Sequence, residues 1–216
     1  EFEEIIRPGH GVVSFGFIHT LGMEVVPELM ADSQKIYPNM QVTLTQSTSS
    51  SLLRKLEEGA IDLCLSQKIK SKQIEIETIE LWQEELFVIV PLTHPLAKQE
   101  SIRLEEIKNE QFISIKSGNS LRQVVDSFFE QIGVEKKSTF AGEEMHTIAG
   151  FVGAGLGVSL IPDIKGLDNY NVKKLRVTYP ECKRSIGVSW AKNRYLSPSA
   201  TEFKNYLLEY FNGENE

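Results

Sequence analysis

Short apolar runs alternate along the chain with stretches in which apolar residues recur every three or four positions. Four runs rich in Val, Ile, Leu and Phe predict strands, at 12–18, 40–46, 60–66 and 85–91. The stretches 23–36 and 52–59 have helical spacing, and Gly59 ends the second of these helices. Pro27 falls inside the first helical pattern, so this helix either begins late or has irregular first turns.

The same order of elements recurs in the second half of the chain. A strand at 111–116 is followed by a helix at 121–132, which carries one continuous apolar stripe and ends at Gly133. A strand at 137–142 comes next, and the last helix is predicted at 197–211. In each half, a strand passes through a short loop containing Ser or Thr into a helix, and then into another strand. This repeat predicts an α/β fold with parallel sheets that helices cover on both faces.

The segment 146–162 is rich in glycine and raises the alternative of a phosphate-binding loop. A dinucleotide-binding fingerprint needs a strand, then glycines, then a helix, because the helix N-terminus faces the pyrophosphate. Here helical spacing comes first, followed by Gly155 and Gly157 and then by a second apolar run. The sequence therefore predicts a helix that turns into a strand, with Gly150 and Gly153 allowing the helix to pack closely on its sheet.

Charge and composition argue against several classes of protein. The net charge is −7, which disfavours nucleic-acid binding by this chain alone. Cys64 and Cys182 are far apart, and Cys64 is predicted to be a buried thiol. The four histidines show no metal-ligand spacing and no nucleophile motif stands out, so no metal, no cofactor, no catalytic residue and no enzyme activity is predicted. A catalytic triad assembled in space stays an alternative. No apolar run reaches the length of a membrane helix.

Four motifs resemble the effector-binding domain of LysR-type transcriptional regulators. They are "GFIHTLG", "KLEEGAIDLCL", "VPLTHPLAK" and, most specifically, "AGFVGAGLGVSLIP". The resemblance spans about residues 4–211. It is strongest to the branch that includes the activator of the glutamate synthase operon, through "HPLAKQ", "KRSIGV" and "KNRYLSPSA". Residues 1–11 resemble only the end of that family's linker helix, so the chain is expected to be a fragment without the winged helix-turn-helix.

The resemblance implies two Rossmann-like lobes of the type 2 periplasmic-binding-protein kind, with a cleft between them. Lobe I would comprise residues 12–90 and 192–216, and lobe II residues 91–191. The crossovers are placed near Val90–Pro91 and near Ser189–Lys192. The effector would lie in the cleft.

Three loops that end strands, open helices and carry hydroxyl groups form the candidate effector site. They are residues 19–20, 47–51 and 117–120. Helix N-termini present unpaired N–H groups, so a small carboxylate would suit these loops. By family position, the effector contacts would be Thr20, Ser49, Asn119, Ser120 and Leu121, with the N–H of Gly118 nearby. His19 and His146 are further candidates, as pH-sensitive ligand partners or as locally hydrogen-bonded residues.

Structural interpretations of these residues stay open at this point. Thr20, Ser49 and Ser120 are also good N-cap residues. Arg122 either reaches an anion or is solvated. His94, which precedes Pro95, is predicted to be structural, and the Asp62 carboxylate is predicted to accept from nearby backbone donors.

The predicted function is that of the ligand-sensing regulatory domain of a cytoplasmic transcription regulator. The alternative is a solute-binding protein of a transporter, which shares the fold. The resemblance implies a homodimer in which helix 23–36 packs antiparallel to helix 121–132 of the partner, beside strands 41–46 and 137–141. The full-length protein would be a tetramer that contacts DNA only through its N-terminal domain, with no membrane partner.

Overall fold

The computed structural model describes residues 9–136 and 138–213, which fold into two compact units. Unit 1 comprises Glu1–Trp82 and Ser185–Glu216, and unit 2 comprises Gln83–Arg184. Both boundaries fall inside strands, β4 (Ile76–Pro91) and β10 (Lys183–Ala191), so two strands connect the units. The lobe boundaries implied by the resemblance stay a prediction.

The sheet of unit 1 is mixed, with a parallel core. Strand β1 (His10–Ile18) pairs in parallel with β2 (Asn39–Ser47) on one side and with β3 (Leu63–Ser66) on the other. Strand β10 then adds antiparallel to β3, and the first half of β4 follows β10. The register of β1 and β2 is continuous from His10↔Asn39 to Ile18↔Ser47, so the two strands end together.

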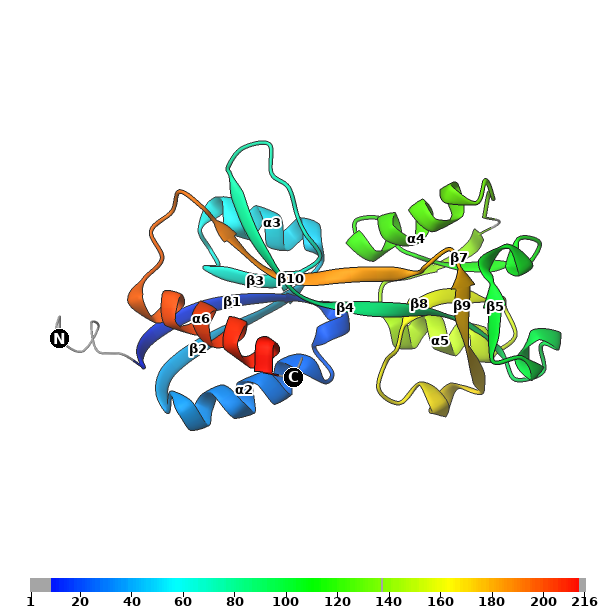
Figure 1. Cartoon of the computed structure of the whole chain (residues 1–216), viewed down its shortest axis with the longest axis horizontal. Helices are drawn as coiled ribbons and strands as arrows, with labels where there is room; N and C mark the ends of the chain where they lie inside the picture. Colours follow the sequence, from blue (N-terminus) through cyan, green and yellow to red (C-terminus); the bar gives the residue numbers. More distant parts are fainter. Residues whose placement is uncertain (1–8, 137, 214–216) are drawn as a thin grey trace. The chain divides into compact units, whose positions relative to one another are not determined.

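Helices cover both faces of this sheet (Figure 1). Helix α3 (Ser49–Glu58) lies on one face, and α2 (Val25–Ile36) and α6 (Pro198–Gly213) lie on the other. Side chains alternate along a strand, which explains how β1 serves both layers. The Phe15 ring packs edge-on against Phe203 of α6, with centroids 5.2 Å apart, whereas a Cβ atom on Gly16 would lie 2.7 Å from Leu52 of α3.

Unit 2 contains two sets of strands and two main helices. Strand β4 pairs antiparallel with β8 (Ser159–Pro162) and with β9 (Val172–Tyr179), and β9 pairs in parallel with β5 (Ser101–Arg103). Strand β6 (Phe112–Ile115) pairs in parallel with β7 (Ser138–Gly142). Helices α4 (Ser120–Gln131) and α5 (Met145–Gly153) lie on opposite sides of these strands in Figure 1.

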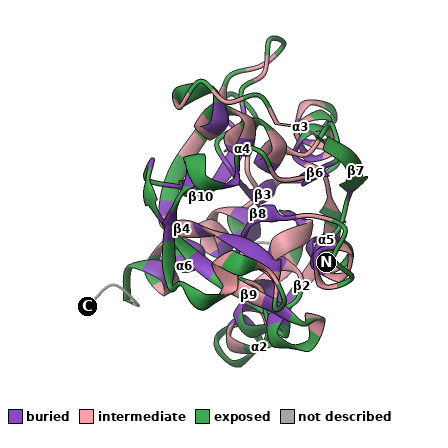
Figure 2. Cartoon of the chain, turned by 90° about the vertical axis from the view of Figure 1, so that its right-hand side faces the viewer, coloured by how far each residue is buried: buried purple, intermediate pink, exposed green. Residues whose placement is uncertain are grey.

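Short 3₁₀ turns complete the connections. They are η1 (His19–Leu21), η2 (Pro95–Lys98), η3 (Leu104–Ile107) and η4 (Leu167–Tyr170). Buried residues gather on the strands, for example on β8, and exposed residues on the outer faces of helices such as α2 (Figure 2). No helix of the described residues is long and apolar enough to span a membrane.

The helices and strands predicted from periodicity are confirmed. Helix α2 begins at Val25 with Pro27 in its first turn, so the late start is the correct alternative. Strands β5, β9 and β10 and the first half of β4 were not predicted. In β5, β9 and the first half of β4, charged residues stand beside the buried positions and interrupt the apolar pattern. In β10, glycine and serine interrupt the apolar residues of the buried stretch that follows Arg184. Residues 1–8 of the expected linker remnant lie outside the described residues, and residues 10–11 already belong to β1.

The predicted passage from helix through glycine to strand is also confirmed, with one correction. Gly155 and Gly157 have φ angles of 81° and 155°, between the end of α5 and the start of β8. A Cβ atom on Gly157 would lie 2.3 Å from the Gln111 carbonyl oxygen. The prediction that Gly153 faces the sheet is wrong, because a Cβ atom there would meet the carbonyl oxygen of Tyr170, at the end of η4. Gly150 has only ordinary contact distances, also to Tyr170.

Candidate functional site

Two of the predicted loops come together at the carboxyl edge of the parallel strands in unit 1. Ile18 and Ser47 are paired as the last residues of β1 and β2, so His19–Thr20 and Thr48–Ser49 follow at the same edge. The side-chain amide of Gln46, near the end of β2, donates to the His19 carbonyl oxygen at 3.4 Å and ties the first loop to β2. In open α/β sheets, this edge is where ligands bind.

The N-cap interpretation of the three predicted hydroxyl residues is wrong. Thr48 caps α3, because its Oγ1 accepts from the Ser51 N–H at 3.4 Å, and Ser49 is the first helical residue, only 5% exposed. Thr20 lies within η1, and the N-cap of α2 is Glu24. Ser120 is likewise the first residue of α4, not its cap.

Unit 2 repeats this arrangement with β6 and β7. The paired residues Ile115 and Gly142 end the two strands, and the chain then enters α4 and α5. Asn119 caps α4, since its Oδ1 accepts from the Leu121 N–H at 3.0 Å. Unit 2 therefore brings Gly118, Asn119, Ser120, Leu121 and His146 to one edge, close to two helix N-termini.

Two buried polar atoms at this edge have no hydrogen-bond partner among the described residues: Ser114 Oγ and His146 Nδ1. Ser114 is 1% exposed and is the penultimate residue of β6. It shares a strand face with Phe112, whose ring packs edge-on against Phe129 of α4. His146 is the second residue of α5, with its ring 5.6 Å from that of Tyr170. An unpaired buried polar atom is costly, so these two atoms are candidates for ligand contacts.

The same rules could have identified two residues that the sequence analysis missed. Ser114 is a polar residue inside an otherwise apolar strand, which is the signal that was overlooked. Gln67 directly follows β3, the third parallel strand of unit 1, and is 6% exposed. Its position at the carboxyl edge is equivalent to that of His19.

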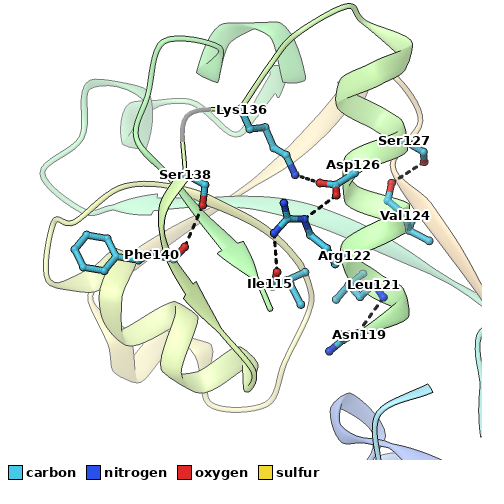
Figure 3. A network of polar contacts seen from close by, with 10 residues as sticks. All are labelled: Ile115, Asn119, Leu121, Arg122, Val124, Asp126, Ser127, Lys136, Ser138 and Phe140. Carbon is cyan, nitrogen blue, oxygen red and sulfur yellow. Dashed lines mark hydrogen bonds and ion pairs between the residues drawn. The ribbon is translucent and has the colours of Figure 1, made fainter. Parts of the chain in front are cut away.

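Arg122 belongs to an ionic network rather than to solvent (Figure 3). Its Nε donates to Asp126 Oδ2 at 2.7 Å, and its Nη1 donates to the Ile115 carbonyl oxygen at 2.9 Å. Lys136 donates to the other Asp126 oxygen, and its side chain is only 9% exposed. Burial opposes ionisation of Asp126, but the hydrogen bonds from Lys136 and Arg122 outweigh it and hold the carboxyl pKa below its usual value.

Two residues have the structural roles that the sequence predicted. His94 caps η2 through Nδ1, which accepts from the Leu96 N–H at 3.2 Å, and Pro95 occupies the first turn. The Asp62 carboxylate accepts from the Ser14 N–H at 2.8 Å.

Among the described residues, the two thiols form no disulfide and the acidic groups form no metal-binding cluster. Cys64 and Cys182 are free and buried, and burial raises the pKa of each thiol to about 12. Over residues 9–136 and 138–213, no group of three or more His, Cys, Asp or Glu side chains is placed to hold a metal ion.

A pocket of about 490 Å³ on unit 1 is lined by residues that include Glu75 and Arg194. It lies at the edge of the sheet opposite Thr20 and Ser49.

The chain is similar to transcriptional regulators over almost its whole length. The family model of the LysR substrate binding domain matches residues 7–212. The chain is 49% identical over 211 residues to the uncharacterized HTH-type transcriptional regulator YybE of Bacillus subtilis (strain 168), covering 98% of this chain and 72% of YybE. It is 30% identical over 214 residues to the transcriptional dual regulator GltC of the same organism, covering 98% of this chain and 71% of GltC.

A solved structure agrees with the sequence comparisons. The effector binding domain of QuiR in complex with shikimate is 32% identical and matches with a TM-score of 0.90, over 94% of this chain and 98% of that chain. These matches favour a regulator over a transporter's solute-binding protein, although the two share a fold. The chain belongs to the family of LysR substrate-binding domains, the regulatory part of LysR-type transcription regulators.

Proposed function

We propose that the chain senses a small metabolite carrying a carboxylate, and that residues from both units contact it. Thr20, Ser49 and His19 would do so from unit 1. From unit 2, the contacts would be Gly118, Asn119, Ser120, Leu121 and His146, together with the buried hydroxyl of Ser114. The shikimate bound by QuiR, a relative of 32% identity, supports a hydroxylated carboxylate as the class of effector.

The observation that carries this proposal is the pair of orphaned polar atoms in unit 2. Ser114 Oγ and His146 Nδ1 are buried without a partner, beside the helix starts that follow β6 and β7. In the tautomer that protonates Nδ1, His146 donates a hydrogen bond to a carboxylate, and a serine hydroxyl both donates and accepts. Helix N-termini add a partial positive charge. An anion with hydroxyl groups would satisfy this set of donors without a dedicated lysine.

The parent regulator would use this module to modulate DNA binding in the cytoplasm. We propose that the chain itself is not an enzyme and does not bind DNA, since its net charge is −7. DNA would be contacted by a winged helix-turn-helix elsewhere in the parent protein. A ligand shifts a conformational equilibrium only through its different affinities for the two states, so effector binding would have to favour one arrangement of the units.

We also propose a homodimer, and a tetramer for the full-length protein. The faces involved would be α2 with β2, and α4 with β7 of the partner. Among the strands of the described residues, β2 pairs with β1 alone, and exposed apolar residues such as Ile36, Leu44 and Phe140 lie on these elements. Light scattering that shows only monomer at high micromolar concentration would contradict the dimer.

Calorimetric titration with shikimate tests the proposed site. Thr20→Val keeps the shape of the side chain and removes its hydroxyl, and Ser120→Ala removes the hydroxyl at the start of α4. Each change is expected to weaken binding by about tenfold, the effect of losing one hydrogen bond to a charged group. Thr93→Val is the matched control. Thr93 follows β4, and β4 runs antiparallel to β6, so Thr93 lies at the edge opposite the proposed contacts of unit 2.

A panel of other small carboxylates, amino acids and amines extends the test if shikimate does not bind. Unchanged affinity of both Thr20→Val and Ser120→Ala for the effector would place the site elsewhere. An effector that is cationic or wholly apolar would refute the role of the helix N-termini.

A further inference from the structure

We propose that Arg122 is a positioning residue, which holds the loop between β6 and α4 in the shape needed for effector binding, and that Asp126 and Lys136 hold Arg122 in place. This inference rests on the proposed function, since the loop carries Gly118 and Asn119. It assigns the ionic network of Figure 3 a supporting role in place of direct effector contact.

The guanidinium of Arg122 joins the two ends of the loop. Arg122 lies in the first turn of α4, and its Nη1 donates to the carbonyl oxygen of Ile115, the last residue of β6. Between these residues, the Asn119 N–H donates to the Lys116 carbonyl oxygen at 3.4 Å, and Asn119 caps the helix. The start of α4 is therefore fixed relative to the end of β6 by a side chain as well as by the backbone.

Asp126 keeps the guanidinium in this orientation. It lies one turn further along α4 and accepts from Arg122 Nε at 2.7 Å. Its second oxygen is occupied by Lys136, whose ammonium lies 5.0 Å and 5.1 Å from the ring centroids of Phe112 and Phe129. Because Lys136 is buried against these rings, the carboxylate has little freedom to turn away from Arg122.

The same geometry argues that Arg122 supports the loop rather than binding the anion. Asp126 already balances its charge, and Nη1 is engaged with the Ile115 carbonyl oxygen. An effector that captured this nitrogen would release the carbonyl oxygen and loosen the loop. A rigid loop keeps the N–H groups at the helix start aligned before the effector arrives, which lowers the entropic cost of binding.

Amide hydrogen exchange, followed by NMR on the whole chain, tests this role without any ligand. Arg122→Gln and Arg122→Lys are expected to speed exchange at Asn119, Ser120 and Leu121 by about tenfold, as expected for loss of one charged hydrogen bond. Lysine keeps the charge but has a single nitrogen, so it cannot serve both acceptors in their present positions. Arg176→Gln is the matched control, because Arg176 forms an exposed ion pair with Glu85 in the same unit.

Asp126→Asn provides a second variant. It is expected to give the same local effect together with a loss of stability, because it leaves the buried Lys136 ammonium without its counter-charge. In Arg122→Gln and Arg122→Lys, faster exchange throughout unit 2 would mean that the network only stabilises the fold, and loop exchange equal to that of Arg176→Gln would mean that it does not hold the loop. Either result overturns the inference.

Shikimate affinity separates this inference from the proposed function. If the unsubstituted chain binds shikimate, Arg122→Lys is expected to bind it several-fold more weakly, while Arg176→Gln is expected to bind it with unchanged affinity. Equal shikimate affinities of the unsubstituted chain and Arg122→Lys would refute the positioning role. If no carboxylate binds the unsubstituted chain, the proposed function fails, and the exchange measurement still decides whether Arg122 orders the loop.

Discussion

Units 1 and 2 share the same passage from paired parallel strands into helices but stabilise it with different side chains. In each unit, paired parallel strands end together and enter helices at the same edge, at Ile18 and Ser47 in unit 1 and at Ile115 and Gly142 in unit 2. Unit 1 secures this edge with a threonine cap and a glutamine-to-backbone hydrogen bond. Unit 2 adds a partly buried ionic network beside α4.

The difference extends to polar groups that the fold leaves unsatisfied. The buried side-chain atoms without a partner in the described part of the chain, on Ser114 and His146, both belong to unit 2. A group of this kind costs stability, so unit 2 gives up stability at the same edge that the network reinforces. The comparison indicates that topology places the ligand-binding edge, whereas individual side chains prepare it.

The largest expected effect is a loss of stability when a methyl group is added at a closely packed glycine, and it differs between the two units. Gly157→Ala is expected to destabilise unit 2 by more than about 2 kcal/mol, because φ is 155° and the new Cβ would lie 2.3 Å from a backbone carbonyl oxygen. Gly16→Ala in unit 1 would clash only with the ends of the Leu52 and Ile61 side chains, which can shift, and its Cβ would lie at an ordinary contact distance of 3.4 Å from Cys64 Cβ, so the substitution is expected to cost about 1 kcal/mol. Thermal denaturation measures both.

Gly155→Ala is the control within unit 2. Its φ is 81°, but no atom lies within 4 Å of the added Cβ, so only backbone strain of about 1 kcal/mol is expected. Equal melting temperatures for the unsubstituted chain, Gly155→Ala and Gly157→Ala would refute the requirement for glycine at these two positions.

A smaller effect distinguishes satisfied from unsatisfied buried hydroxyls. Ser159→Ala is expected to lower the free energy of unfolding by about 1 kcal/mol, because Ser159 Oγ donates to the Ile113 carbonyl oxygen at 2.8 Å. Ser114→Ala removes an unpaired atom and is expected to be neutral or stabilising. Denaturant unfolding of the two variants gives the comparison, and a larger loss for Ser114→Ala would show that its hydroxyl already has a partner.

The smallest expected effect concerns the thiols, one in each unit. With a pKa of about 12, about one thiol in ten thousand is ionised at pH 8, and both thiols are buried. A thiol-reactive chromophore should therefore leave the native chain unlabelled. Cys64→Ala and Cys182→Ala, labelled in increasing denaturant, would show which unit opens first. Rapid labelling of the native chain would contradict the burial of that thiol.

The sequence by itself determined the α/β class and most of the elements around the candidate site. Apolar periodicity of 3.6 or the apolar runs of buried strands sufficed for β1, α3 and α4, because each of these elements buries a continuous apolar run or stripe whichever segment packs against it. The order of helix, glycines and strand at 146–162 was also enough to exclude a dinucleotide loop, since that chemistry requires the opposite order.

Tertiary structure alone decided the rest. Charged residues interrupt the apolar pattern of β9, and Ser185, Gly187 and Ser189 interrupt that of β10, so only their pairing with β4 and β3 reveals them as strands. Whether Thr48 or Ser49 caps α3 depends on a shift of one residue that propensity does not resolve. Arg122 meets Asp126 within one helix, but Lys136 and Ile115 reach this network from other segments, and Ser114 lacks a partner only because of what packs around it. Hydrogen-bond satisfaction and close approach are properties of atoms brought together from distant parts of the chain, which a local pattern does not encode.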